Sequence, residues 1–273
     1  KNEPLYEISQ IKVTSETWPG LSPNDEFAGF EQWNYTLSAD YQRPVNHRGS
    51  FARQALLDGM AQDVAGKGNP FKYGFIGDSD THNAAGTNEE FNNTGKFAHE
   101  NDPRFALGGA PGMPEGQIQQ IREFSSGGLA GVWAEKNTRG SIYDAMQRKE
   151  TFGTSGTMIK LRFFGGWDFN GDDVKAGDFV KRGYKRGVPM GSDLKGSGKA
   201  PTFMVSAVKD PKSGNLDRVQ IVKGWLDAKG AQHEKIYDVV WSGARQRDAA
   251  GKLPAVGDTV DLKTGKYANS IGA

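Results

Sequence analysis

The stretch GFIGDSDTHN, residues 74–83, decides how the fold of this chain is interpreted. An apolar run that ends at Ile76 is typical of a buried strand. Asp80 and His82 follow it as a D-x-H pair. Residues two apart in an extended segment point to the same side, so this carboxylate and this imidazole are expected to leave the strand end together. Mixed oxygen and nitrogen ligands of this kind hold zinc, manganese or iron.

The structural alternative is a turn rich in Asp and Ser, with His82 capping a neighbouring segment. An isolated D-x-H pattern is short, and alone it favours that alternative. Here the pair follows a buried-type strand directly, and α/β proteins place their chemistry at the carboxyl ends of strands. Asp80 and His82 are therefore the candidate catalytic and metal-binding residues.

The composition excludes several classes of protein. The 273 residues carry 34 basic and 33 acidic side chains, so nothing in the charge favours nucleic acid or an anionic membrane as a partner. No apolar run approaches the roughly 20 residues that span a bilayer. The absence of Cys excludes disulfides, thiolate metal sites and cysteine nucleophiles. The chain begins at Lys1 without a signal peptide, which is typical of a processed or truncated product. A periplasmic or exported protein is compatible with this, although the compartment is not specified.

The first part of the chain is expected to alternate strands with helices. A strand is predicted over 4–13, followed by an irregular loop to about residue 50. Ser50 is the expected N-cap of a helix over 51–66, because apolar residues recur there at helical spacing. After the D-x-H turn, residues 84–128 have the polar, glycine-rich composition of a mobile lid.

Near residue 153 the sequence pattern changes from alternating strands and helices to successive strand-like runs. This change predicts two domains, 1–153 and 154–273. Before it, residues 128–135 are a strand candidate, and Thr138 is the expected cap of a helix over 139–150. After it, five strand-like runs are separated by turn residues, and no helix is expected among them. The fold class is therefore predicted as α/β, followed by a β-rich and mainly antiparallel region, in the form of a sandwich.

Glu7 is a carboxylate inside the first predicted strand, between Tyr6 and Ile8. A carboxylate in an apolar strand is costly unless it is paired or binds a cation, which makes Glu7 a candidate ligand. An edge strand with Glu7 facing water is an equally good interpretation of the pattern. We interpret three acids of the first long loop as solvated side chains: Glu16, Asp25 and Glu26.

Only four His occur, and neither H-x-H nor H-E-x-x-H is present, so this chain cannot supply a His-rich zinc site by itself. We interpret the three His other than His82 as ordinary surface residues: His47, His99 and His233. Ser155 in GTSG does not match a nucleophile elbow. Residues 168–173, DFNGDD, lack the terminal Glu of a calcium loop and are interpreted as a turn.

Four long runs carry a resemblance to a known family: NPFKYGFIGDSDTHN, GLAGVWAEKNTRGSIYDAMQRKETFGTSG, IKLRFFGGWDF and NLDRVQIVKGWLD. They resemble the C-terminal half of a bacterial domain-of-unknown-function family, number 3604, placed in the polymerase and histidinol phosphatase (PHP) superfamily. The resemblance extends over essentially the whole chain. Proteins of that superfamily are similar to distorted (β/α)7 barrels with two or three metal ions at the carboxyl ends of the strands.

The resemblance implies that residues 1–153 form the later part of such a PHP-like barrel. Asp80 and His82 match the last metal-binding motif of the superfamily, and Glu7 falls where a carboxylate ligand at a strand end is expected. The opening H-x-H motif is absent, and Trp18 stands where relatives often have His. The resemblance therefore implies either an incomplete site or an N-terminal polypeptide that completes the barrel.

Two functions follow from these observations. The first is a metal-dependent hydrolase of phosphate esters with a small-molecule substrate, in which divalent zinc, manganese or iron activates a water molecule. Possible phosphate-binding cations are Arg122, Lys136 and Arg139. The second is a degenerate, non-catalytic barrel with a β region that binds carbohydrate or protein through Trp167, Trp225 and Trp241.

Overall fold

The computed structural model describes residues 3–36, 42–84, 95–106 and 111–273. The strands are β1 (Leu5–Gln10), β2 (Val13–Thr14), β3 (Gly74–Gly77), β4 (Leu129–Val132), β5 (Thr151–Thr154), β6 (Lys160–Gly166), β7 (Gly187–Pro189), β8 (Thr202–Val208), β9 (Arg218–Leu226) and β10 (Gln232–Trp241). The helices are α1 (Ala52–Val64), the 3-10 helix η2 (Ala98–Asn101), α2 (Pro103–Ala106), α3 (Glu115–Arg122), α4 (Arg139–Gln147), α5 (Gly171–Lys175) and α6 (Phe179–Arg186). Within these ranges, the length and polarity of each helix exclude it as a membrane span.

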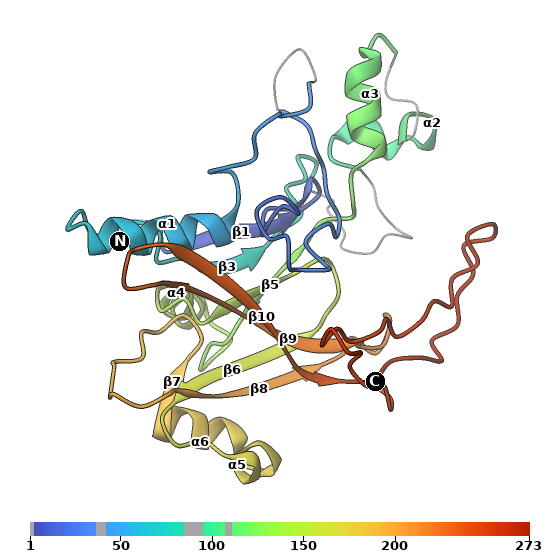
Figure 1. Ribbon diagram of the computed structural model, residues 1–273. Coiled ribbons are helices and arrows are strands. Elements are labelled where there is room, and N and C mark those ends of the chain that lie inside the picture. The colour runs from blue at the N-terminus through green and yellow to red at the C-terminus, as the bar shows by residue number, and fades with distance from the viewer. Residues whose placement is uncertain (1–2, 37–41, 85–94, 107–110) are drawn as a thin grey trace.

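The first sheet has the strand order β2-β1-β3 and contains a parallel pair. Strands β1 and β3 run parallel, with Glu7 opposite Ile76, and β2 returns antiparallel to the end of β1. The connection to β3 contains α1, because parallel strands need a crossover. Figure 1 shows α1 lying alongside β1 and β3. The carboxyl ends of β1 and β3 therefore lie at the same edge of the sheet.

Helix α1 agrees with the predicted helix over 51–66, but its cap differs. Its N-cap residue is Phe51, which has an extended backbone and makes no side-chain capping hydrogen bond. The expected cap, Ser50, is therefore wrong. The helix ends at Val64, and Gly66 has a φ of 74°, the left-handed conformation that commonly follows a helix.

Strands β4 and β5 pair antiparallel, and α4 connects them. The Thr138 side chain accepts a hydrogen bond from the backbone N of Ser141, which confirms it as the cap of α4. Strand β3 passes close to this pair. A Cβ at Gly77 would lie 2.8 Å from the carbonyl oxygens of Leu129 and Thr154, so this approach of three backbones needs a residue without a side chain.

The predicted α/β fold with the later part of a (β/α)7 barrel is wrong. In the described residues the strands form separate sheets of three, two, two and three strands, and β1–β3 is the parallel pair among them. A (β/α)7 barrel repeats a parallel strand and a helix around a closed sheet. Here β5 turns back antiparallel onto β4 although a helix lies between them. The later strands are also antiparallel, and antiparallel connections need no helix.

Strand β6 forms the centre of the sheet β7-β6-β8, with both neighbours antiparallel. A buried aromatic cluster covers one face of it: Phe164, Phe169 and Met204, with Phe179 packed against them. Helices α5 and α6 lie below this sheet in Figure 1. The expectation that residues after 157 contain no helix is therefore wrong.

Residues 168–170 lead into α5, whereas residues 171–173, which were also interpreted as part of a turn, form the start of the helix. The Asn170 side chain accepts hydrogen bonds from the backbone N of Asp172 and Asp173, and Asp173 accepts one from the backbone N of Asn170. The buried Asp173 carboxylate also lies 2.9 Å from Arg182 and 2.5 Å from Arg186. This acid is therefore occupied in capping α5 and in joining α5 to α6.

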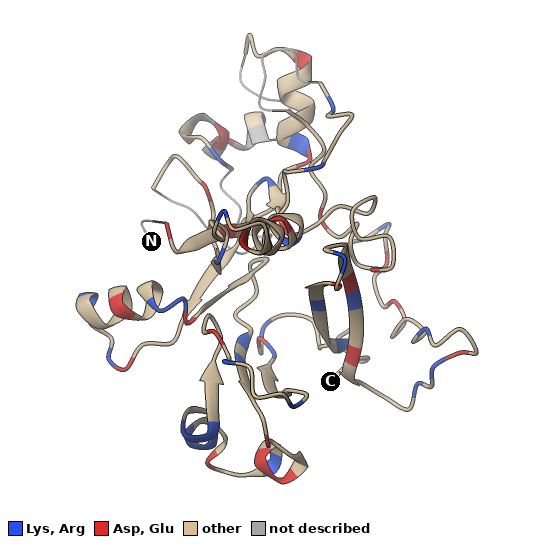
Figure 2. Cartoon of the chain, turned by 60° about the vertical axis from the view of Figure 1, so that its left-hand side comes forward, with Lys and Arg blue, Asp and Glu red and all other residues tan. Residues whose placement is uncertain are grey.

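Strands β9 and β10 form a long antiparallel hairpin that reaches α1 in Figure 1. A Cβ on Gly224 of β9 would lie 3.1 Å from Leu57 of α1, so this strand packs directly on the helix. Figure 2 shows basic and acidic residues side by side on this hairpin, in agreement with the near-zero net charge. The three Trp residues that were expected as an exposed binding surface, Trp167, Trp225 and Trp241, are only partly exposed.

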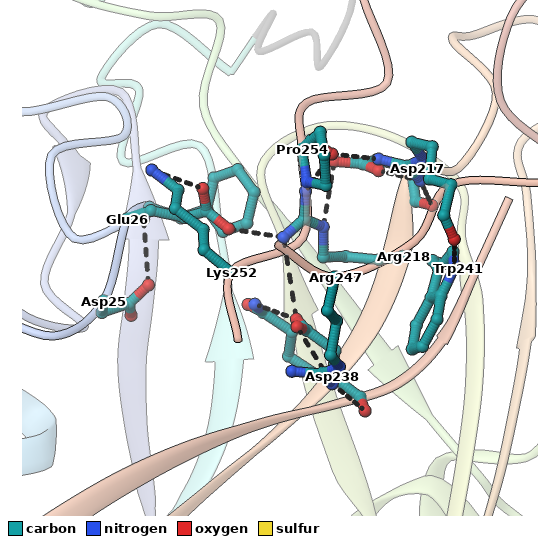
Figure 3. Close-up of polar contacts among 12 residues, drawn as sticks. Asp25, Glu26, Asp217, Arg218, Asp238, Trp241, Arg247, Lys252 and Pro254 are labelled. Atoms are coloured by element: carbon teal, nitrogen blue, oxygen red, sulfur yellow. Dashed lines mark hydrogen bonds and ion pairs between the residues drawn. The ribbon is translucent and has the colours of Figure 1, made fainter. Parts of the chain in front are cut away.

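An ion network centred on Arg218 joins three distant segments (Figure 3). The Arg218 side chain, 4% exposed, contacts Glu26 of the first long loop and lies 3.7 Å from Asp238 of β10. It also donates a hydrogen bond to the carbonyl oxygen of Pro254. Lys252 lies 3.5 Å from the same Glu26. The loop, the hairpin and the C-terminal segment are therefore held together by charges.

Candidate functional site

The candidate site lies at the carboxyl edge of the parallel pair β1–β3. The backbone continues the pairing beyond β3, because Asp78 N donates to Ser9 O at 2.9 Å and Ile11 N donates to Ser79 O at 3.1 Å. This pairing fixes the D-x-H turn beside the end of β1. Asp80 itself has a φ of 54°, a left-handed conformation that Asp adopts more readily than most residues.

Two lysines hold the Asp80 carboxylate. Lys96 Nζ donates to Asp80 Oδ2 at 2.5 Å and also to the Asp80 carbonyl oxygen at 2.5 Å. Lys12 Nζ donates to the same Oδ2. Both lysine side chains are largely buried, at 15% exposure for Lys12 and 8% for Lys96. One negative charge therefore faces two positive charges in a sheltered position.

This arrangement shifts the pKa values of Asp80 and Lys96. Burial raises the pKa of Asp80, but the hydrogen bonds and charges of Lys12 and Lys96 lower it by more, so the net shift is downward. Burial lowers the pKa of Lys96, and the nearby charge of Lys12 lowers it further, against the hydrogen bond to Asp80. Asp80 is therefore held as the carboxylate, while Lys96 loses its proton more easily than an ordinary lysine.

His82 lies next to Asp80, but in a turn where Asp80 is left-handed and not in the extended segment that the D-x-H prediction assumed. Its Nε2 is 3.5 Å from Asp80 Oδ1, and its side chain is 53% exposed. The Phe97 ring meets the imidazole edge-on with centroids 5.1 Å apart. A backbone hydrogen bond of 2.7 Å from His82 N to Lys96 O fixes the segment. The imidazole therefore faces solvent beside a buried carboxylate–lysine cluster.

Glu7 is close enough to the cluster for its ionisation to be affected. Burial is the largest cause that raises the pKa of Glu7, followed by the negative charges of Asp80 and Asp78. The Gln10 side chain donates a weak hydrogen bond to Glu7 Oε2 at 3.4 Å. At Glu7, β1 pairs with β3 on one side, while β2 pairs only with Ser9 and Gln10 further along the strand, and Glu7 is half-buried.

The residues of this cluster do not complete a metal site. Over the ranges that the structure describes, no group of three or more His, Cys, Asp or Glu is placed to hold a metal ion. Asp80 and His82 are suitable donors, but the two lysine ammonium groups already neutralise Asp80. A divalent ion would therefore need to displace these ammonium groups and to find further ligands.

Sequence reasoning missed Lys12 and Lys96. Lys12 lies 68 residues before Asp80, and Lys96 lies 16 residues after it. Lys12 lies near the end of the predicted strand over 4–13, so its place at the same sheet edge as Asp80 was a usable signal. The position of Lys96 depends on the path of the loop after His82, and no sequence pattern marks it.

The other candidates lie away from the cluster. Glu16 and Asp25 both pair with Arg53, and Glu26 pairs with Arg218, so these loop acids are engaged in ion pairs. The remaining candidates are placed as follows: His47 stacks on Trp18, His233 pairs with Asp227, Arg122 pairs with Glu115, and Lys136 and Arg139 are exposed near the start of α4. The side chain of His99 lies outside the described residues, as does part of the expected lid.

The fold and the site together define a protein of mixed helices and small sheets with a charged cluster at the edge of a parallel strand pair. The chain belongs to the family described as Protein of unknown function (DUF3604), whose model matches residues 1–273. Comparison with curated proteins and with solved structures gave no match.

Proposed function

We propose that this chain takes part in the metal-dependent hydrolysis of small phosphate esters, with Asp80 and His82 as two of the metal ligands and Glu7 beside them. One observation carries the proposal: Asp80 Oδ1 and His82 Nε2 approach to 3.5 Å at the carboxyl edge of β1 and β3. The resemblance of the D-x-H motif to that of the polymerase and histidinol phosphatase superfamily supports the same chemistry.

The protein groups of the cluster suit an anionic substrate. A divalent ion bound there would lower the pKa of a bound water and neutralise charge on a phosphoryl oxygen. Lys12 and Lys96 hold two ammonium groups against Asp80, and they would be free to meet a phosphate only once a bound divalent ion had displaced them from that carboxylate. The exposed His82 imidazole can accept or donate a proton at the solvent side.

The ligand count sets the expected level of activity. Catalytic metal sites of this type use about three protein ligands and keep one position open for water. Asp80 and His82 would supply two such ligands. Among the described residues, no group of three or more His, Cys, Asp or Glu is placed to hold a metal ion. The proposal therefore expects weak turnover from the 273-residue chain alone and stronger turnover when a further polypeptide supplies donors.

The test uses a chromogenic phosphodiester with added manganese or zinc, and metal content measured by mass spectrometry as an independent readout. Asp80→Ala and His82→Ala should each lower turnover and bound metal by about tenfold or more, because they remove a ligand. The matched controls are Asp227→Ala and His233→Ala, a second Asp–His pair at 2.9 Å on the far hairpin. These controls should change neither quantity.

Two results would overturn this function. The first is robust turnover that survives both Asp80→Ala and His82→Ala, because it would place the chemistry elsewhere. The second is unchanged metal content in both variants, because the pair would then not be a ligand pair. Metal content that stays below one ion per ten chains at millimolar metal, with no turnover, would favour the non-catalytic alternative.

A further inference from the structure

A cavity of about 560 Å³ lies on the other side of the first sheet from Glu7. Helix α1 contributes Leu56, Leu57 and Met60 to its wall, and Val222 of β9 faces them. Ile8 of β1 also lines it, whereas its neighbour Glu7 points to the opposite face, because successive strand side chains alternate. The volume lies within the range of small-molecule sites, which is about 300–1,000 Å³.

The wall of this cavity is mostly apolar. Besides the helix residues, Phe71 and Tyr73 from the segment before β3 and Phe75 from β3 itself line it. Leu56, Leu57 and Met60 are only partly buried although they face the interior side of α1, which agrees with an open space beside them. Such a wall favours a ligand with an aromatic or branched aliphatic body.

One end of the cavity carries an excess of negative charge. Arg53 lies 2.5 Å from Glu16, 2.7 Å from Asp25 and 3.6 Å from Glu234. Three carboxylates therefore surround one guanidinium, and both Glu16 and Glu234 line the cavity. Arg53 is 15% exposed and is fully engaged by these acids, so it is not available to bind an anionic ligand.

The two acids that line the cavity retain acceptor capacity. The hydrogen bonds that Arg53 donates to Glu16 both end on Oε1. The contact with Glu234, at 3.6 Å, is longer than a hydrogen bond. At the opposite end, Lys72 and Asp193 pair with each other at 2.9 Å, and both are mostly exposed, which places them at the mouth. Lys149 also lines the cavity beside Lys72, whose carbonyl oxygen accepts a hydrogen bond from Lys149 Nζ at 3.1 Å. The lining as a whole therefore balances three acids with three cations, and the local excess of negative charge is confined to the Glu16–Glu234 end, where Arg53 is the one lining cation.

We propose that this cavity binds an organic cation, an amine on an aromatic or branched aliphatic body, with its ammonium group beside Glu16 and Glu234. The apolar wall takes the body of the ligand, and the acids satisfy the charge. The cavity shares no lining residue with the Asp80 cluster, so this site is independent of the proposed hydrolase function.

The probe is 2-phenylethylamine, compared by calorimetry at neutral pH with 2-phenylethanol and 3-phenylpropionate. The three probes share a phenyl body and differ in charge. The amine should bind about tenfold tighter than the alcohol, a difference of about 1.4 kcal/mol. The carboxylate should bind more weakly than either, because in the pose of the amine its charge faces Glu16 and Glu234.

Substitutions separate the two parts of the proposed site. Glu16→Gln combined with Glu234→Gln keeps the shape and should remove the tenfold preference for the amine, while binding of the alcohol stays unchanged. Met60→Trp should fill the cavity and weaken all three probes, with Leu57→Phe as a milder second variant. Circular dichroism and thermal unfolding check that each variant folds. Glu135→Gln, an exposed surface change, and Asp80→Ala should leave binding of the amine unchanged.

Several results would overturn the proposal: no saturable binding of 2-phenylethylamine by the wild-type chain, equal affinity for the three probes, or a preference for the amine that survives the double Gln substitution. Loss of amine binding in Asp80→Ala would place the amine at the other cluster instead. Because metal content and phosphodiester turnover are measured separately, failure of this proposal leaves the hydrolase test unaffected.

Discussion

At the scale of single residues, the charges of Glu7 and Asp80 act in opposite directions on stability. The pKa of Asp80 is lowered in the folded state, so its contribution to stability is present above its unfolded pKa and is lost as the pH falls through the folded value. The pKa of Glu7 is raised, chiefly by burial. Its ionisation therefore lowers stability as the pH rises from the unfolded to the folded pKa.

Glu7→Gln is accordingly expected to raise the free energy of unfolding at pH 7. The difference from the wild type should disappear as the pH falls below the unfolded pKa of Glu, about 4.3, because Glu7 is then protonated in both states. Urea unfolding at a series of pH values measures this. Glu3→Gln, at an exposed position before β1, is the control and should show no such dependence. A lower stability of Glu7→Gln at pH 7 would contradict the assignment of Glu7 as a destabilising charge.

The residues of the candidate site were predictable only where they are local in sequence. Asp80 and His82 are two residues apart after one strand, so their nearness was predictable, although a left-handed turn at Asp80 and not an extended segment produces it. Glu7 required the pairing of β1 with β3, which the strand pattern suggests but does not specify. Lys12 and Lys96 reach Asp80 from separate loops. Loop paths depend on tertiary packing, so the ion pairs that dominate the cluster were not predictable.

At the scale of elements, helices with strong local signals were predicted and helices held by packing were not. Thr138 and the apolar spacing after it identified α4. Helix α6 has Gly183 in its middle, and glycine is a poor helix former. That glycine faces the buried Phe164 ring, since a Cβ there would lie 2.5 Å from the ring. Helix α6 is therefore specified by close contact with β6, which a local pattern does not reveal.

Two Gly→Ala substitutions test this difference. Gly140→Ala in α4 meets open space and should raise the free energy of unfolding by about 0.5–1 kcal/mol, because alanine favours a helix. Gly183→Ala gains the same propensity but forces its methyl group into Phe164, so it should lower the free energy by about 1–3 kcal/mol. Urea unfolding of both variants gives the comparison. Equal effects of the two changes would mean that α6 does not pack as described.

At the scale of the whole molecule, the sequence predicted strands correctly in many places but predicted the wrong architecture. The runs expected as strands include β6, β8, β9 and β10. Strands β9 and β10 pair with each other as a hairpin, whereas β6 pairs with β8 across a longer stretch of chain. Strand β5 reverses onto β4 where a parallel neighbour was expected. The division at residue 153 stays a prediction. Ion pairs cross it, including Glu150–Arg162 and Arg53–Glu234, so the two parts are linked by charge.

The Arg218 network has a consequence for folding kinetics. Arg218 and Glu26 are 192 residues apart, so their contact closes a very long loop and is expected to form late, after the transition state. Arg218→Met should therefore speed unfolding by about tenfold or more and change the folding rate little, as measured by stopped-flow fluorescence in urea. Arg247→Met, which removes a more exposed partner of Asp238, is the control. An equal slowing of folding would show that the contact forms early. If it forms late, the network protects the chain by delaying its opening, and the time the protein stays folded depends on one buried guanidinium.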